Sequence, residues 1–268
     1  MPNRLFFVLL LASLSACNTT DPPSDTLRLR VLTYNIHHGE GTDGVFDYPR
    51  LADIIKRAQP DLVALQEVDV KTRRAGGVDQ AARLGELTGM HHAFAEAMPY
   101  QGGSYGEAVL SRMPIRAFYN HKLPHDEGHE PRSAAVASVA QWRGEPPVVF
   151  AGTHLCHQSA QTRLRQVRSI VGHRAYEGPL TVLAGDFNFT PDSDAYRVMI
   201  DAGWVDAAAA FGDPRPTIPA DEPTRRIDYV FVRPAEAWRV VDVQVLDEPV
   251  ASDHAPVLVV LEYISPEP

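Results

Sequence analysis

The chain has 268 residues, of which 44% are hydrophobic and 22% charged, so it can bury the core of one large domain or of two small ones. The sequence has no long linker, repeat or low-complexity tract, which favours one domain. A formal net charge of -9 argues against a sequence-independent grip on nucleic acid through a wide basic surface. It does not exclude a nuclease, because an active-site groove needs only local positive charge or a metal ion.

The N-terminal segment has the pattern of a targeting signal. A basic residue, Arg4, precedes an apolar run over residues 5–11 that is too short to span a membrane. The tetrapeptide Leu14-Ser15-Ala16-Cys17 resembles the lipobox of bacterial lipoproteins, which implies cleavage before Cys17 and lipid attachment to it. An ordinary secretory signal with an incidental cysteine is the alternative.

Three parts of the chain are therefore expected. They are a signal peptide over residues 1–16, the lipidated cysteine with a flexible polar tether over 17–26, and a folded domain over 27–264. The lipid would hold the domain on the extracytoplasmic, periplasmic side of the cell envelope. The resemblance to bacterial lipoproteins implies that Asn18 after the cysteine, rather than Asp, would favour sorting to the outer membrane in enterobacteria-like cells. With Cys17 lipidated, no intramolecular disulfide can form.

Apolar runs and amphipathic stretches alternate along the domain, with a stretch of mostly strand pattern in the middle. In chain order, the pattern predicts a strand over Leu27–Tyr34, a helix over Tyr48–Ala58, a strand over Asp61–Leu65, a helix over Val78–Leu87, strands over 93–98, 107–112, 115–123, 133–142 and 147–152, a helix over Gln158–Tyr176, a strand over Leu180–Ala184, a helix over Asp192–Ala202, and strands over Arg226–Val232, Trp238–Leu246 and Pro256–Glu262. Strands paired around intervening helices predict an α/β sandwich of two sheets with helices outside.

Short polar clusters stand at the ends of these apolar strands. In chain order they are Asn35, Gln66-Glu67, Thr153-His154, Asp186 with Asn188, Asp228, and Ser252-Asp253-His254. A strand end is held rigidly by its sheet but reaches solvent, so residues at neighbouring strand ends can converge on one cleft.

The oxygen donors among these residues suit a hard metal ion. Glu67 and Asp253 supply anionic oxygens and Asn35 a neutral one, which favours Mg²⁺ or Mn²⁺ over zinc. His154 and His254 suit a site that stabilises a phosphorane-like charge and moves protons.

Seven short motifs together resemble the endonuclease/exonuclease/phosphatase superfamily. They are TYNIHHG with Asn35, LQEV with Glu67, YGEAVLSR with Tyr105 and Glu107, GTH with His154, GDFN with Asp186 and Asn188, RRIDYVFV with Asp228, and SDHAPV with Asp253 and His254. They follow the family's order over most of the chain. The resemblance implies a four-layer α/β sandwich of two packed mixed sheets with outer helices. It also implies a metal-dependent phosphoesterase, in a family that includes deoxyribonucleases, sphingomyelinases and inositol polyphosphate phosphatases.

The resemblance also implies roles for the first group of residues. Glu67 would be the main metal ligand, with Asn35 and Asp253 nearby. Asp186 would position or deprotonate the attacking water, and Asn188 would bind a phosphate oxygen and orient Asp186. Whether one metal ion or two act stays open.

The remaining roles concern the two histidines. His254, paired with Asp228, would contact the phosphate or act as the base in place of Asp186. His154, with Glu107 as its partner, would bind another phosphate oxygen or protonate the leaving group.

Other residues are candidates for binding the substrate. Arg132 lies in a polar loop, where it could reach a substrate phosphate or hold an acidic neighbour, and Tyr105 is a second candidate. Of the adjacent His37 and His38, at most one is expected to face the cleft, because neighbouring side chains on a strand point to opposite sides.

These observations favour a lipid-anchored, monomeric, Mg²⁺- or Mn²⁺-dependent phosphodiesterase. Its substrate would be nucleic acid, a lipid headgroup or a small phosphate ester. An extracytoplasmic nuclease is one alternative, and a catalytically inactive binding module of the envelope is another.

Overall fold

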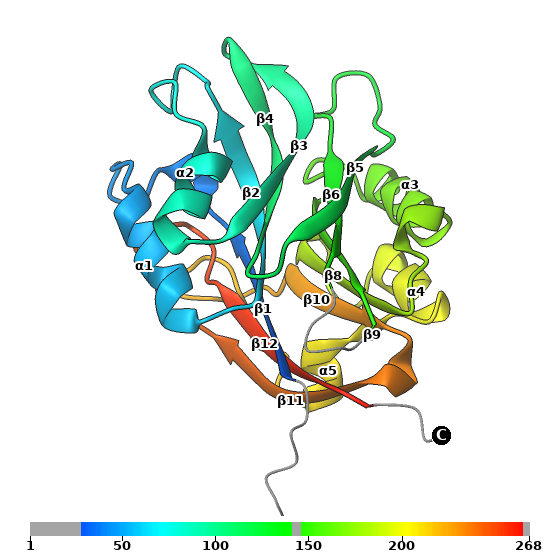
Figure 1. Cartoon of the computed structure of the whole chain (residues 1–268). Helices are drawn as coiled ribbons and strands as arrows, with labels where there is room; N and C mark the ends of the chain where they lie inside the picture. Colours follow the sequence, from blue (N-terminus) through cyan, green and yellow to red (C-terminus); the bar gives the residue numbers. More distant parts are fainter. Residues whose placement is uncertain (1–27, 141–145, 265–268) are drawn as a thin grey trace, which may run out of the picture.

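Two six-stranded sheets pack face to face in the computed structural model, which describes residues 28–140 and 146–264 (Figure 1). The first sheet has the order β11 (Trp238–Val245), β12 (Val257–Tyr263), β1 (Arg28–Asn35), β2 (Leu62–Val70), β4 (Gly103–Ser111) and β3 (His91–Tyr100). The second has the order β5 (Ile115–Lys122), β6 (Ser133–Val139), β7 (Val148–His154), β8 (Leu180–Asp186), β10 (Asp228–Arg233) and β9 (Val205–Asp206).

Helices cover the outer faces of both sheets. On the first sheet lie α1 (Tyr48–Ala58) and α2 (Gln80–Thr88), and on the second α3 (Ala160–Val171) and α4 (Asp194–Asp201) (Figure 1). The predicted four-layer sandwich of two mixed sheets is therefore confirmed.

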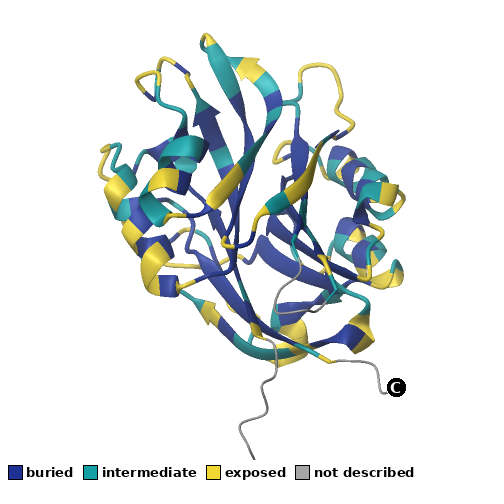
Figure 2. Ribbon diagram, viewed as in Figure 1, coloured by how far each residue is buried: buried dark blue, intermediate teal, exposed yellow. Residues whose placement is uncertain are grey.

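The core strands are buried at successive positions, as the dark blue ribbons of Figure 2 show, so their side chains are covered on both faces of each sheet. In β1, Leu29 and Val31 enter the apolar layer between the sheets, whereas Leu32 and Tyr34 pack beneath α1 and α2. A strand buried on both faces needs apolar side chains at successive positions. This is why these strands read as continuous apolar runs.

Capping residues set the helix boundaries. The carboxylate of Asp47 accepts a hydrogen bond from the backbone N–H of Arg50 at 2.9 Å and begins α1. Ser159 begins α3 in the same way, but α3 ends at Val171 with Gly172 as its C-cap, and a separate 3-10 turn, η2, follows over Arg174–Tyr176. The single helix predicted over Gln158–Tyr176 was therefore wrong in its C-terminal part. The short strand β9 and helix α5 (Ala207–Phe211) were not predicted.

The register of the second sheet places three predicted site residues side by side. Strands β7 and β8 are parallel, with His154 opposite Asp186, and antiparallel β10 places Asp228 on the other side of Asp186. In the first sheet, parallel pairing of β1 with β2 sets Asn35 opposite Gln66. Parallel strands end at the same edge of a sheet, so this register brings the polar clusters together.

The sequence pattern predicted that strand β2 ends at Gln66-Glu67, but the strand continues to Val70. Its pairing with β4 shifts register between Leu65 and Val68, and Glu67 within this bulge has a φ of 60°. A β-bulge re-aims a side chain out of the normal alternation. The bulge thus turns Glu67 toward the polar edge while the strand goes on.

In residues 28–140 and 146–264, no helix is both long enough and apolar enough to cross a membrane.

We predict that Gly185→Ala separates β7 from β8 at the polar edge. A Cβ at Gly185 would overlap the backbone carbonyl of Thr153, which cannot move without breaking the parallel pairing. The free energy of unfolding should fall by about 1–3 kcal/mol, measured by urea denaturation. Gly172→Ala is the control, because a Cβ there would lie 3.3 Å from the nearest atom, the carbonyl oxygen of Arg168, and not overlap it. Equal stability of the two variants would contradict this account.

Candidate active site

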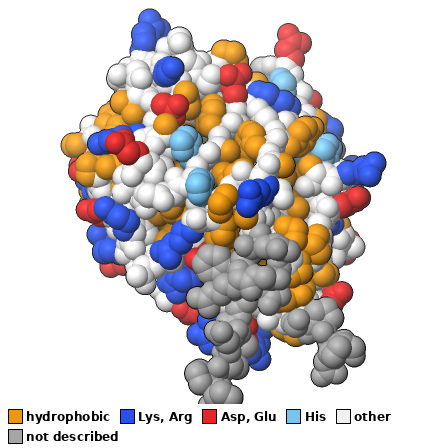
Figure 3. Space-filling view, viewed as in Figure 1, with side chains coloured by type: hydrophobic (Ala, Val, Ile, Leu, Met, Phe, Trp, Pro, Cys, Tyr) orange, Lys and Arg blue, Asp and Glu red, His pale blue; other side chains and the backbone are white. Residues whose placement is uncertain are grey.

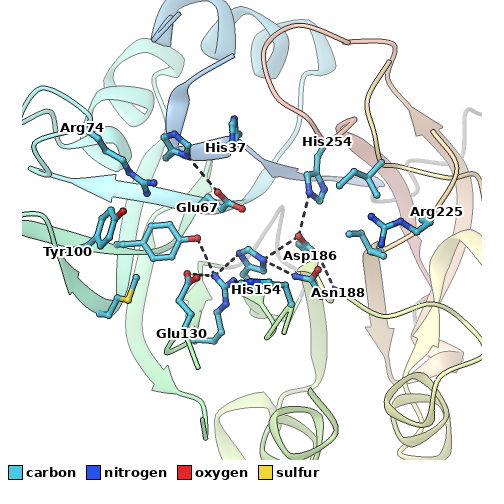
Figure 4. Close-up of a pocket in the computed structure, with 17 residues that line it drawn as sticks. His37, Glu67, Arg74, Tyr100, Glu130, His154, Asp186, Asn188, Arg225 and His254 are labelled. Carbon is cyan, nitrogen blue, oxygen red and sulfur yellow. Dashed lines mark hydrogen bonds and ion pairs between the residues drawn. The ribbon is translucent and has the colours of Figure 1, made fainter. Parts of the chain in front are cut away.

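The strand ends surround an open pocket of about 390 Å³ (Figure 4). It is formed by the polar ends of both sheets and by the loops that follow them. Seven predicted site residues line it: Glu67, Tyr105, Arg132, His154, Asp186, Asn188 and His254.

Asp186, at the end of β8, is the common partner of three other predicted residues. Its Oδ2 lies 3.3 Å from Nε2 of His154 and 3.7 Å from Nε2 of His254. The same oxygen accepts a hydrogen bond from Nδ2 of Asn35 at 3.2 Å. Burial raises the pKa of Asp186 to about 7, although the charge of His254 opposes the rise. A carboxylate with such a pKa can take up a proton near neutral pH.

Asn188 is held beside Asp186 by the loop that follows β8. Its backbone N–H donates to Oδ1 of Asp186 at 2.9 Å, and its side-chain Nδ2 donates to the carbonyl of Leu155 at 3.1 Å. The residue has a φ of 50°, in the left-handed region that Asn tolerates better than most residues. The loop therefore presents its amide at the pocket in one orientation.

Asn35 lies beneath the pocket floor and joins the two sheets. It is 1% exposed, and its Nδ2 donates to Oε1 of Glu67 at 3.1 Å as well as to Asp186. Burial alone would raise the pKa of Glu67, but the neighbouring His38 and the Asn35 amide lower it well below its ordinary value. Glu67 is therefore ionised and faces the pocket from the first sheet.

His254 lies between two carboxylates. Its Nδ1 donates to Oδ2 of Asp228 at 3.0 Å, and that oxygen also accepts a hydrogen bond from the Thr217 hydroxyl at 2.6 Å. Burial lowers the pKa of His254, but the charges of Asp228 and Asp186 outweigh it and raise the pKa to about 10. The imidazole is thus a cation at neutral pH.

The expected pairing of His154 with Glu107 is not what the structure contains. Glu107 is fully buried and does not line the pocket, and within residues 28–140 and 146–264 no hydrogen bond joins its carboxylate to His154. Nη1 of Arg132 instead donates to Nδ1 of His154 at 3.1 Å. The reason is geometric: the guanidinium, 2% exposed, occupies the place beside the imidazole.

This neighbour fixes the state of His154. A guanidinium can only donate, so Nδ1 of His154 accepts and the ring proton is on Nε2, toward Asp186. Burial and the charge of Arg132 lower the pKa of His154, which keeps the ring neutral. Arg132 also bonds the Tyr105 hydroxyl at 3.1 Å and pairs with Glu130 at 3.0 Å. Arg132 thus holds an acidic neighbour, as one of its two predicted roles required; the other was contact with a substrate phosphate.

Several pocket residues were missed by sequence reasoning. Both His37 and His38 line the pocket, contrary to the expectation that at most one would, because they lie in the 3-10 turn η1 (His37–Gly39) and not on a strand. Other polar and aromatic lining residues are Arg74, Tyr100, Glu130, His157 and Arg225. They come from loops and strand margins, and no motif set them apart in the sequence.

One predicted metal ligand has another position. Asp253 does not line the pocket; its backbone carbonyl accepts a hydrogen bond from Ala220 N, and its Oδ1 lies 3.4 Å from the Ser252 hydroxyl. Cys17 lies outside the described residues.

The donor set fits a hard divalent cation. Glu67 and Asp186 are carboxylates on either side of the Asn35 amide, and such oxygen ligands suit Mg²⁺ and Mn²⁺. A second arrangement comprises Asp186, Asp228 and His254, whose ligand atoms lie within 4.8 Å of one another. In that arrangement the imidazolium already offsets one of the two carboxylate charges, and as a cation it has no free ring nitrogen for a metal ion. We therefore favour the Glu67 side as the metal position.

Comparison with known proteins gives one family. Residues 32–254 match the sequence model of the endonuclease/exonuclease/phosphatase family. The uncharacterized protein YbhP of Escherichia coli K12 is 27% identical over 242 residues, which cover 85% of this chain and 93% of YbhP.

Solved structures have the same fold. An endonuclease/exonuclease/phosphatase from Beutenbergia cavernae is 29% identical, with a TM-score of 0.70 over 88% of this chain and 72% of its own. A mannosyl-6-phosphatase from Bacteroides thetaiotaomicron has 19% identity and a TM-score of 0.71 over 87% of this chain and 99% of its own. The human Nocturnin catalytic domain has 18% identity and a TM-score of 0.72 over 89% and 96%.

We predict that Asp228→Asn lowers the pKa of His254 from about 10 toward its ordinary value of about 6.5, because the nearest counter-charge is lost. A pKa raised by folding contributes stability that is fully present below about pH 6.5 and is lost as the pH rises through about 10. The variant should therefore lose most stability at pH 6 and least above pH 10.

Two measurements check this prediction: imidazole chemical shifts followed by NMR titration, and urea denaturation at both pH values. Asp213→Asn, which removes a surface partner of Arg215, is the control and should have little effect at either pH. An unchanged His254 titration in Asp228→Asn would refute the pairing as the cause.

Proposed function

We propose that this chain, which belongs to the endonuclease/exonuclease/phosphatase family, is a Mg²⁺- or Mn²⁺-dependent phosphodiesterase of the cell envelope. Family members hydrolyse phosphate esters, and the pocket holds the groups that such a reaction needs. The metal dependence and the preference for a diester are inferred from the site residues, and the envelope location from the N-terminal sequence.

One observation carries the proposal: the buried Asp186 carboxylate is shared by Asn35, His154 and His254 at 3.2, 3.3 and 3.7 Å. A carboxylate bonded by side chains from both sheets has a fixed direction. A purely structural carboxylate would not need an open pocket beside it, with a cationic imidazole on one side and Glu67 on the other.

The residues divide the chemistry between them. A divalent cation held by Glu67, with the Asn35 amide beside it, would polarise the phosphoryl group and lower the barrier to attack by water. Asp186 orients that water and accepts its proton. The His254 imidazolium, kept charged by Asp228, stabilises the negative charge that develops on a phosphoryl oxygen.

On the other side of Asp186, two side chains face the same phosphate. Nε2 of His154 and Nδ2 of Asn188 lie 3.0 Å apart. With the ring proton on Nε2 both atoms are donors, so one phosphoryl or leaving-group oxygen placed beside them would accept from both. Arg132 keeps His154 in the tautomer that presents this proton. No covalent intermediate is needed, since water is the nucleophile.

Nucleic acid is the alternative substrate class, and the protein would then be a nuclease. The face in Figure 3 carries Lys and Arg side chains scattered among Asp and Glu, and on its described part no continuous basic tract is visible. This distribution, like the net charge of -9, argues against firm duplex binding through a wide basic surface.

We predict that Glu67→Gln abolishes Mg²⁺ binding in calorimetry, whereas Glu130→Gln retains it. Both residues line the pocket, but Glu130 is already paired with Arg132.

Asp186→Ala should lower hydrolysis of bis(p-nitrophenyl) phosphate by at least about 100-fold, as expected for loss of a general base. Nicking of supercoiled plasmid, sensitive to EDTA and to Asp186→Ala, would identify a nuclease. A folded protein that binds no Mg²⁺ and turns over no phosphoester would instead support the inactive binding module.

We also predict that Cys17→Ala moves the protein from the membrane fraction to the soluble fraction of cells. Labelling with radioactive palmitate checks lipid attachment directly, because the proposed lipid is bonded to this cysteine. Unchanged fractionation and no label on the wild-type protein would favour the ordinary secretory signal.

A further inference from the structure

A second cavity adjoins the active-site pocket. It has a volume of about 470 Å³ against about 390 Å³ for the pocket, and the two share Asn188, Arg225 and Ile227 in their walls. The N-terminal turn of α3 and the loop from Phe189 into α4 form the rest of its lining. The shared wall runs beside Asn188, where the reacting phosphate would lie, so a substrate can extend from one cavity into the other.

Arg225 lies at this boundary, and its side chain has no hydrogen-bond or ion-pair partner among the described residues. Other arginines around the two cavities have protein partners: Arg74 pairs with Asp69, Arg132 with Glu130, and Arg163 donates to the carbonyl of Cys156. The exposed guanidinium of Arg225 has no hydrogen bond or ion pair to any residue within 28–140 and 146–264. In Figure 4 it lies on the flank beyond Asn188 and His254, opposite Arg74 and Tyr100.

The backbone at Arg225 is nevertheless fixed. Its N–H donates to Ile218 O at 3.1 Å, and its carbonyl accepts from Thr217 N at 2.8 Å and from Ile218 N at 3.1 Å. The next residue, Arg226, forms a buried ion pair with Asp206 at 2.5 Å. The structure thus holds the base of the side chain while leaving its charged end free, which lowers the entropy cost of binding an anion there.

Within the described residues, neither acidic residue of the second cavity forms an ion pair with Arg225. Asp192 is bonded by the Thr190 hydroxyl, and Asp194 is paired with Arg197. A planar guanidinium with free donors suits a phosphate group, which it can bind through two parallel hydrogen bonds.

We propose that Arg225 forms a second anion subsite, which binds a phosphate group of the substrate next to the one that is cleaved. The subsite rests on the proposed phosphoesterase function and narrows its substrates to compounds with two neighbouring phosphates. The two groups are either directly joined, as in a diphosphate, or separated by a sugar, as in a nucleic acid chain. The second cavity then holds the part of the substrate beyond the second phosphate.

Calorimetric titration with four ligands tests the subsite. Inorganic phosphate and AMP each offer one phosphate group, and inorganic pyrophosphate and adenosine 3′,5′-bisphosphate are their two-phosphate counterparts. Every protein carries Asp186→Asn, which prevents turnover, and free Mg²⁺ is kept constant. Arg225→Gln is compared with Arg168→Gln, which removes another exposed arginine that lines neither cavity.

We expect Arg225→Gln to weaken binding of at least one two-phosphate ligand by about 10-fold or more, and binding of its one-phosphate counterpart by less than about twofold. Loss of pyrophosphate affinity alone would identify a joined diphosphate, and loss of bisphosphate affinity alone a sugar-separated pair. Arg168→Gln should change neither.

Three results would overturn the subsite: no preference of the wild-type Arg225 protein for either two-phosphate ligand, an equal effect of Arg225→Gln on both ligands of each pair, or no binding of any ligand. Hydrolysis of bis(p-nitrophenyl) phosphate by protein with Asp186 intact is measured separately. Turnover without the subsite effect rejects the subsite alone, whereas absence of turnover rejects the proposed function.

Discussion

The structure depends on keeping one buried carboxylate, that of Asp186, bonded from several directions. A buried charge without partners is costly in a low-dielectric interior, so the chain must bring polar groups to it from elsewhere. Asn35 reaches it from the first sheet, His154 from the neighbouring strand, and His254 from the loop before the last strand. Polar contacts to this residue therefore join the two sheets, in addition to the apolar packing between them.

Sheet geometry explains how such side chains can be aimed. The pairing of β7, β8 and β10 sets His154, Asp186 and Asp228 in one row, so their spacing is fixed by the hydrogen bonds of the sheet. Glu67 cannot use this device, because its strand continues past it, and a bulge with positive φ turns it to the pocket instead. Rigid positions of this kind lower the reorganisation needed when charge moves during a reaction.

The arginines around the pocket show a division between structural and available charge. Arg132 is enclosed by Tyr105, Glu130 and His154, and its charge acts mainly on the state of the histidine. Arg225 has a fixed backbone and a guanidinium that has no partner in the described part of the chain. Within one family fold, such free side chains at the pocket margin are where substrate preference can differ while the chemistry stays the same.

The sequence by itself determined the two-sheet sandwich and the clustering of Asn35, His154, Asp186 and His254, because strand ends and their polar residues are visible in a local pattern. It also indicated Glu67, but the bulge that turns this side chain to the pocket was seen only in the structure. Only the tertiary structure decided which side chain stands next to which. It placed Arg132, and not Glu107, beside His154, let both His37 and His38 face the pocket, and set Arg225 between two cavities. Periodicity along one strand gives the side a residue faces, but a contact between strands distant in the chain depends on bulges, turns and the approach of the sheets. These are properties of the packed chain, in which each side chain must share space with all its neighbours.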